Sequence, residues 1–229
     1  MFTKSLLTLA AIITLSHHSL AADDINVIVD LPLTASKGLV VIAPAKKYLM
    51  QERLFSAMAK KLRESGYTTV RFNWSAKTLT EPELELTRAS EDMYKVITEA
   101  QTKFNVSAEK TILISKSFST KALSASVSLA KTHIMLTPNC TADTTFEQTY
   151  SDILSNDAIS LSMMISNEDP NCDVRQIHGA LAKLSRLPGL FTTRGDHNFV
   201  LRTSDGQSNF TFQDQVIELV SKQIEAIRE

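Results

Sequence analysis

The chain has 229 residues, 43% of them hydrophobic, and its 24 Lys and Arg residues nearly balance 25 Asp and Glu residues, giving a formal net charge of -1. This length supports one sizeable α/β domain, and six Gly and six Pro residues are too few for a chain of several linked domains. Proteins that bind nucleic acid through its phosphates carry a basic surplus, which this composition lacks. We therefore expect a single globular domain and no nucleic-acid partner.

Residues 1–21 have the three parts of a secretory signal. Lys4 supplies a basic start, residues 6–15 form a short apolar run, and Ser19 and Ala21 place small residues before a cleavage point. The run is too short to span a bilayer comfortably. We expect cleavage after Ala21, a mature domain over residues 22–229 without a membrane span, and a periplasmic or secreted location. The alternative is a buried N-terminal helix.

The expected strands are recognised by their apolar runs. After a polar stretch, residues 25–30 alternate between apolar and polar side chains and end before Pro32, which is typical of an edge strand. Later runs are continuously apolar, as in strands covered on both faces. They lie at residues 38–43, 68–72, 111–114, 134–136, 161–165 and 190–191.

Helical patterns lie between these strands. From Met50 to Leu62, apolar residues recur every four positions, and Gly66 follows where a left-handed cap would end a helix. Residues 84–104 and 216–227 carry two more amphipathic helices, and Pro82 suits the first turn of the former. Strands that alternate with helices of this length predict a mostly parallel twisted sheet in a three-layer α/β/α sandwich.

The two cysteines, Cys140 and Cys172, each lie just past a predicted strand. Because export permits disulfides, these residues could form a bridge. Such a bridge would stabilise the fold by roughly 3 to 4 kcal/mol in the loop-entropy treatment. Two unpaired, buried cysteines are the alternative.

A candidate nucleophile follows the strand at residues 111–114. A strand that runs into Ser117 and then into a helical pattern is the layout that exposes a reactive hydroxyl on a sharp turn. Ser115 and Ser119 stand where such turns usually have glycine. Ser117 could instead be a helix N-cap, and Ser119 is the second candidate nucleophile.

An acid and a base follow Ser117 in the order used by serine hydrolases with a Ser, Asp, His triad. Asp169 comes after the strand ending near residue 165, and His197 comes after the strand ending near residue 193. Because ligands bind at the carboxyl ends of parallel strands, we expect the three side chains at one edge of the sheet. Glu168 and Asp173 compete with Asp169 as the acid.

Acyl transfer also requires hydrogen-bond donors for a developing oxyanion. The backbone amide of Phe118, which opens a helix, is one candidate. Since Pro44 has no N–H, the amide of Ala45 is the better second candidate. Three lysines near this edge, Lys46, Lys47 and Lys116, could favour an acidic substrate, but we expect ordinary solvated surface side chains.

Taken together, the chain resembles the α/β-hydrolase superfamily, and within it the dienelactone-hydrolase-like branch that includes small proteins similar to a subunit of a histone acetyltransferase complex. The resemblance rests on residues 39–45, 62–67, 70–74, 168–170 and 195–199 and on the turn around Ser117. It implies a minimal fold without a large lid.

The resemblance also implies a function: Ser117 as nucleophile, Asp169 as acid and His197 as base, with no cofactor. The sequence has no H-E-x-x-H motif and no paired C-x-x-C motif, so we expect no metal. The expected activity is cleavage of a small or medium ester, thioester or amide through an acyl-enzyme. Relatives usually carry His-Gly where Ala43 and Pro44 stand. The alternative is an inactive binding protein that uses the same crevice.

Overall fold

The computed structural model describes residues 25–47, 49–140, 145–184 and 186–226. The expected signal over residues 1–21 lies outside the described residues.

A seven-stranded sheet forms the middle layer, in the order β1-β3-β2-β4-β5-β6-β7. The edge strand β1 runs antiparallel to β3, and every other neighbouring pair is parallel. The strands are β1 (Val27–Asp30), β2 (Leu39–Ala43), β3 (Thr68–Phe72), β4 (Thr111–Lys116), β5 (Thr132–Leu136), β6 (Ser160–Ser166) and β7 (Gly189–Thr193). All five inner strands therefore point their carboxyl ends toward one edge, where the candidate site residues lie.

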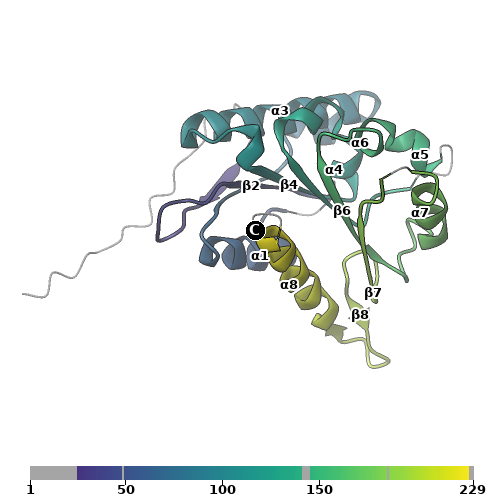
Figure 1. Cartoon of the computed structure of the whole chain (residues 1–229). Helices are drawn as coiled ribbons and strands as arrows, with labels where there is room; N and C mark the ends of the chain where they lie inside the picture. The colour runs from purple at the N-terminus through teal and green to yellow at the C-terminus, as the bar shows by residue number, and fades with distance from the viewer. Residues whose placement is uncertain (1–24, 48, 141–144, 185, 227–229) are drawn as a thin grey trace, which may run out of the picture.

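Helices cover both faces of this sheet (Figure 1). One face carries α1 (Arg53–Glu64) and α8 (Thr211–Ala226); the other carries α3 (Glu85–Phe104), α7 (Val174–Leu181) and shorter helices. The shorter elements are α2 (Ala76–Thr80), α4 (Phe118–Lys121), α5 (Phe146–Thr149), α6 (Ser151–Leu154) and the 3-10 turns η1 (Pro82–Leu84), η2 (Ala108–Lys110) and η3 (Ser124–Leu129). A hairpin of β8 (Leu201–Arg202) and β9 (Ser208–Asn209) precedes α8. The three-layer sandwich predicted from the sequence is confirmed.

The hydrophobic core has two halves, one on each face of the sheet. In β2, Val41 belongs to the half of the core between the sheet and α3. Val40 and Ile42 belong to the other half, between the sheet and the helices α1 and α8. Because successive side chains of a strand point to opposite faces, a strand covered on both faces must be continuously apolar. The run at residues 190–191 is the exception. It lies in the edge strand β7, which is only half-buried, so the expectation of burial on both faces was wrong there.

The end of α1 shows how the sequence sets a helix boundary. Gly66 has φ +95°, and its amide bonds to the carbonyl of Arg63 at 3.0 Å. The Tyr67 amide reaches back to the carbonyl of Leu62, also at 3.0 Å, and both side chains are buried in the same half of the core. This pair of bonds is the Schellman motif, whose left-handed residue favours glycine. The predicted cap at Gly66 is confirmed.

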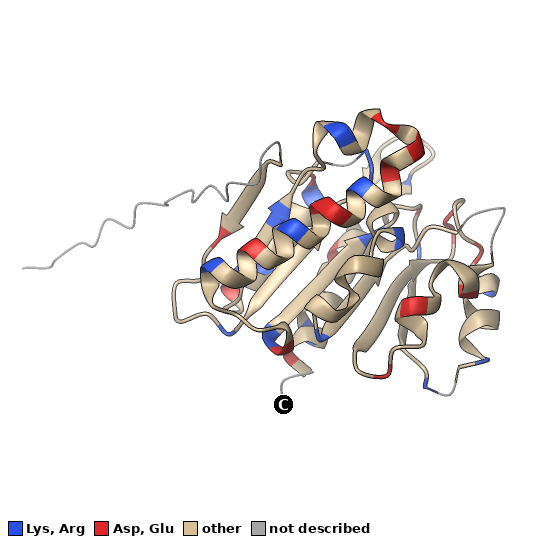
Figure 2. Ribbon diagram, turned by 90° about the horizontal axis from the view of Figure 1, so that it is seen from above, with Lys and Arg blue, Asp and Glu red and all other residues tan. Residues whose placement is uncertain are grey.

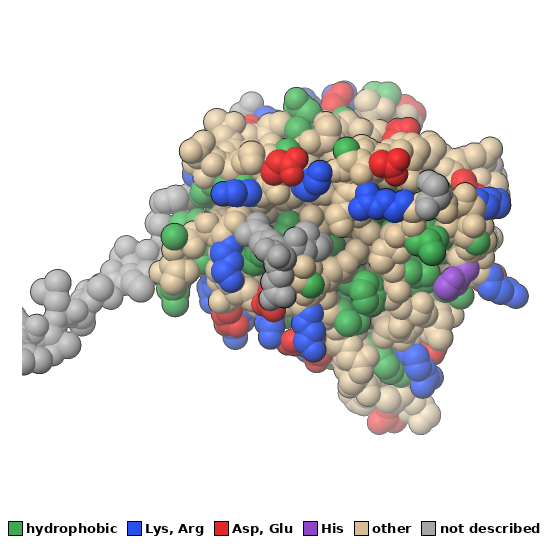
Figure 3. All heavy atoms as spheres, viewed as in Figure 1, with side chains coloured by type: hydrophobic (Ala, Val, Ile, Leu, Met, Phe, Trp, Pro, Cys, Tyr) green, Lys and Arg blue, Asp and Glu red, His purple; other side chains and the backbone are tan. Residues whose placement is uncertain are grey.

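Charged side chains of both signs are distributed over the surface. Figure 2 views the α3 layer from above and shows acidic and basic positions interspersed along its helices. The face shown in Figure 3 has the same mixed character.

In the part of the chain that the structure describes, none of the helices has the length and apolar character needed to cross a bilayer.

Candidate active site

Ser117 lies on a sharp turn between β4 and α4. Its backbone has φ 52° and ψ -110°, a conformation that costs a residue with a side chain about 1 to 3 kcal/mol. The turn is held by the amide of Ser117, which donates to the carbonyl of Leu136 at 3.0 Å. Ser117 stands at the N-cap position of α4, but its side chain makes no capping hydrogen bond to the helix. This strained strand-to-helix turn is the geometry that presents a nucleophilic hydroxyl.

Ser119 occupies a position where such turns usually have glycine, and its hydroxyl forms buried hydrogen bonds with the backbone. Its Oγ accepts from the Lys116 amide at 2.7 Å and lies 3.0 Å from the carbonyl oxygen of Ala43 in β2. The side chain is completely buried and ties the end of β4 to the end of β2. Ser119 is therefore held in a structural contact. Ser115 is also completely buried, and its Oγ has no hydrogen-bond partner among the described residues.

His197 lies between the candidate nucleophile and the candidate acid. Its Nε2 is 2.6 Å from the Ser117 Oγ, and its Nδ1 is 2.7 Å from the Asp169 Oδ2. The Asp169 side chain is 3% exposed and that of His197 is 13% exposed. A carboxylate at Nδ1 selects the tautomer with the proton on that nitrogen, which leaves Nε2 to accept the serine proton. The structure thus brings together three residues from loops after β4, β6 and β7.

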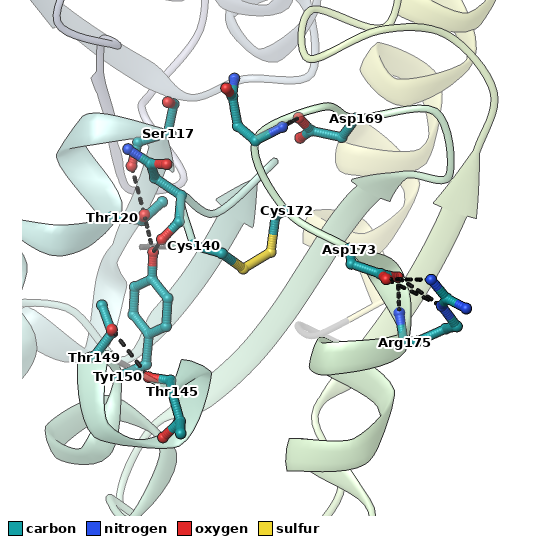
Figure 4. The surroundings of a disulfide bond; sticks show 12 residues. Ser117, Thr120, Cys140, Thr145, Thr149, Tyr150, Asp169, Cys172, Asp173 and Arg175 are labelled. Carbon is teal, nitrogen blue, oxygen red and sulfur yellow. Dashed lines mark hydrogen bonds and ion pairs between the residues drawn. A yellow bond between two sulfur atoms is a disulfide. The ribbon is translucent and has the colours of Figure 1, made fainter. Parts of the chain in front are cut away.

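The turn after β6 also decides which acidic residue faces the histidine. Asp169 accepts the Asn171 amide on Oδ1 at 2.8 Å and uses Oδ2 for His197. The neighbouring Glu168 instead contacts the Arg194 Nε at 3.0 Å on the surface. Asp173 caps α7 and forms an ion pair with the exposed Arg175 at 2.6 Å (Figure 4). Neither competitor contacts the imidazole.

The loop that carries His197 depends on a glycine and an acidic turn residue. Gly195 has φ +105°, and a Cβ there would lie 2.7 Å from the backbone carbon of Phe199, which excludes other residues. Asp196 accepts the amides of Asn198 at 2.8 Å and Val200 at 3.1 Å on one carboxylate oxygen. Asp196 is thus a turn residue that shapes the loop.

Lys116 corrects one of the sequence predictions. We expected a solvated lysine, but the residue is 1% exposed, and its Nζ donates to the His197 carbonyl at 2.6 Å and to the Thr137 hydroxyl at 2.7 Å. Burial lowers the pKa of this amine to about 7, while the carboxylates of Asp169 and Asp196 act in the opposite direction. As the last residue of a central strand, its side chain is directed into the interior below the His197 loop.

The other two lysines behave differently from Lys116. Lys47 is exposed, as predicted, and Lys46 is half-exposed and forms an ion pair with Glu85. The distinction follows from position: Lys116 belongs to a strand, whereas the other two lie in the loop after β2.

Two backbone amides were predicted as oxyanion donors. Phe118 is the first residue of α4, and Ala45 is a buried residue of the loop after β2. Within the described parts of the chain, neither amide donates a hydrogen bond to another residue. The Phe118 ring packs edge-on against Trp74, with ring centroids 5.4 Å apart, which fixes the start of the helix.

Cys140 and Cys172 form a disulfide, as predicted, with their Cα atoms 4.8 Å apart. It joins the loop after β5 to the loop after β6, and Cys172 follows Asp169 by three residues (Figure 4).

In the described ranges, no group of three or more His, Cys, Asp or Glu side chains is arranged to hold a metal ion. The site brings together a hydroxyl, an imidazole and a carboxylate.

A comparison with protein-family models and one with curated proteins each found no match. Solved structures do match. An α-β serine hydrolase homologue from Coxiella burnetii is 16% identical, with a TM-score of 0.67 over 87% of this chain and 91% of that one. An α/β serine hydrolase without a lid from Xanthomonas campestris is 17% identical, with a TM-score of 0.64 over 88% and 87%.

A third similar structure is esterase 2 of Thermogutta terrifontis phosphorylated by paraoxon. It is 11% identical, with a TM-score of 0.69 over 92% of each chain. Likeness at such low identity concerns the course of the backbone. It shows that this chain has the α/β-hydrolase fold, in agreement with the sequence prediction.

Proposed function

We propose that this protein is an exported serine hydrolase of the carboxylesterase type, which cleaves a small or medium ester, thioester or amide through an acyl-enzyme. One observation carries the proposal: the His197 ring lies within hydrogen-bond distance of both the Ser117 hydroxyl and the Asp169 carboxylate. A serine hydroxyl is a weak nucleophile at neutral pH and needs such a base.

In the proposed reaction, the Ser117 Oγ attacks the carbonyl carbon of the substrate while the His197 Nε2 takes its proton. Asp169 stabilises the imidazolium that forms. The negative charge on the former carbonyl oxygen is received by the amides of Phe118 and Ala45. His197 then returns the proton to the leaving group, and a water molecule, activated by the same imidazole, releases the acyl group from Ser117.

The strained backbone of Ser117 also supports this function. Strain of this kind persists only where the surrounding structure enforces it, and such positions cluster at active sites. The occupied hydroxyl of Ser119 leaves Ser117 as the serine that faces the base. Among the similar structures, one is described as an esterase phosphorylated by paraoxon, which suggests a phosphorylating probe as the test.

Reaction with a fluorophosphonate probe tests the proposal. Wild-type protein should become labelled, and Ser117→Ala and His197→Ala should lose labelling by roughly 10³-fold or more, since both nucleophile and base are required. Ser119→Ala is the matched control and should remain labelled. Wild-type protein that folds normally by circular dichroism but does not react refutes the hydrolase and supports the inactive binding protein.

Export is tested separately from catalysis. A signal over residues 1–21 and a disulfide in the mature domain both fit an oxidising compartment. Protein recovered from the expressing cells should begin at Ala22 and contain no titratable thiol. An intact N-terminus at Met1 on cytosolic protein would refute this part of the proposal.

A further inference from the structure

His197 is not the only connection between the Ser117 turn and the Asp169 turn. The Thr120 hydroxyl lies 2.5 Å from the carbonyl oxygen of Ser117 and 2.8 Å from the Tyr150 hydroxyl, and its one proton can serve either contact. Tyr150 in turn donates to the carbonyl of Asn139 at 2.7 Å. Figure 4 shows Ser117, Thr120 and Tyr150 in a row on one side of the disulfide and Asp169 on the other.

The disulfide completes this second connection. Asn139 directly precedes Cys140, and Cys140 is bonded to Cys172 in the loop that carries Asp169. We call the connected residues Thr120, Tyr150, Asn139, Cys140 and Cys172 the brace. The brace and the triad together form a closed ring of contacts. One half of the ring passes through the His197 imidazole, and the other half passes through the Thr120 and Tyr150 hydroxyls and the disulfide.

The hydroxyl part of the brace is buried and depends on both of its members. Thr120 is 1% exposed and Tyr150 is 2% exposed. Each hydroxyl carries one proton, and carbonyl oxygens, which only accept, stand at both ends of the row. Two protons serve three contacts, so at any moment two of the contacts are hydrogen bonds and the third is a close approach of two oxygens. When Thr120 donates to Tyr150 and Tyr150 donates to Asn139, the row is hydrogen-bonded from α4 to Asn139, and loss of the Tyr150 hydroxyl removes both of these bonds. Burial raises the pKa of Tyr150, which keeps its proton in place.

In the described residues, the backbone amides of the Asp169 turn bond mostly within the turn. Glu168 donates to the Ser166 hydroxyl at 3.3 Å, Asp169 to the Ser166 carbonyl at 3.4 Å, and Asn171 to the Asp169 carboxylate at 2.8 Å. Asn167 reaches a different strand, since its amide donates to the carbonyl of Thr193 at 3.0 Å. Pro170, which follows, has no amide proton to donate. The covalent bond at Cys172 is therefore the strongest restraint on the far side of this turn.

We infer that the brace positions the catalytic residues, by holding the Ser117 turn and the Asp169 turn at the separation that His197 requires. This inference rests on the proposed hydrolase function. Tyr150 and the two cysteines are positioning residues, since they act through Ser117 and Asp169. Misplacement of a reacting group by about 1 Å can cost about 10²-fold in rate, so a restraint of this kind affects turnover directly.

The test compares Tyr150→Phe, the pair Cys140→Ala with Cys172→Ala, and all three changes together. Tyr94→Phe, at an exposed tyrosine on α3, is the matched control. With a chromogenic ester, below the onset of thermal unfolding, Tyr150→Phe and the cysteine pair should each lower kcat about 10-fold with KM unchanged. Because the hydroxyls and the disulfide are connected in series, breaking both should have no larger effect than breaking one. The triple variant should therefore lose no more of its kcat than the cysteine pair alone.

Amide hydrogen exchange gives a readout that does not depend on activity. Tyr150→Phe should speed exchange in residues 167–172, and loss of the disulfide should speed exchange in residues 117–121. Wild-type kcat in both variants, losses that multiply in the triple variant, or exchange that rises only beside the changed residue would each overturn the brace. Failure of wild-type protein to react with the fluorophosphonate probe would overturn the proposed function instead.

Discussion

Replacing Lys116 by methionine should change how the stability of this protein depends on pH. Methionine keeps most of the volume of the side chain but removes its amine. The wild-type amine is buried, and its pKa is lowered from 10.5 to about 7 because burial penalises the ammonium. At a pH between about 7 and 10.5, the Lys116 amine is protonated in the unfolded chain but has lost its proton in the folded protein.

The sign and size of the effect follow from this difference in proton binding. Where the unfolded state binds more protons, the free energy of unfolding rises with pH, so wild-type protein gains stability from about pH 7 to 10.5. At 1.36 kcal/mol for each unit of pKa, the full window corresponds to about 5 kcal/mol. The Lys116→Met variant lacks this contribution.

Urea unfolding of both proteins from pH 6 to pH 9.5 measures the effect. The quantity to follow is the difference in free energy of unfolding between the wild-type protein and Lys116→Met. This difference should be constant below pH 7 and then rise by about 1.4 kcal/mol per pH unit. Lys60→Met, at an exposed position on α1, should add no such slope. A difference that stays level up to pH 9.5 would show that the Lys116 amine remains charged in the folded protein, and the reasoning would fail.

Three further substitutions separate strain, packing and catalysis. Ser117→Gly should unfold at higher temperature than Ser117→Ala, by about 1 kcal/mol or more in stability, because glycine relieves the strain at φ 52°. Ser119→Ala should cost about 1 to 3 kcal/mol in urea unfolding, since it leaves the buried Lys116 amide without its acceptor; unchanged stability would contradict this role. Asp169→Asn should lower kcat roughly 10⁴-fold by favouring the wrong tautomer of His197, and near-normal turnover would argue against Asp169 as the acid.

The positions of the strands along the chain and the edge that carries the site were accessible from sequence patterns. Central parallel strands are covered on both faces, so β2 and β4 appear as continuous apolar runs, and Gly66 marks a helix end because few other residues adopt its backbone angles. Residues that follow parallel strands share one edge of the sheet, which is why Ser117, Asp169 and His197 could be grouped before their distances were known. The half-buried edge strand β7 was misjudged, since a two-residue run does not reveal whether a further strand lies beside it.

What the sequence determined by itself was the local conformation and the chemical types available at that edge, since both follow from short-range patterns and from strand direction. Only the tertiary structure decided which side chains meet: that the Lys116 amine lies buried under the His197 loop, and that Tyr150 connects Thr120 to Asn139. Such contacts join segments far apart in the chain, and whether a lysine is solvated or buried depends on what packs over it. No local pattern carries that information, because the contacts exist only once distant elements are packed together.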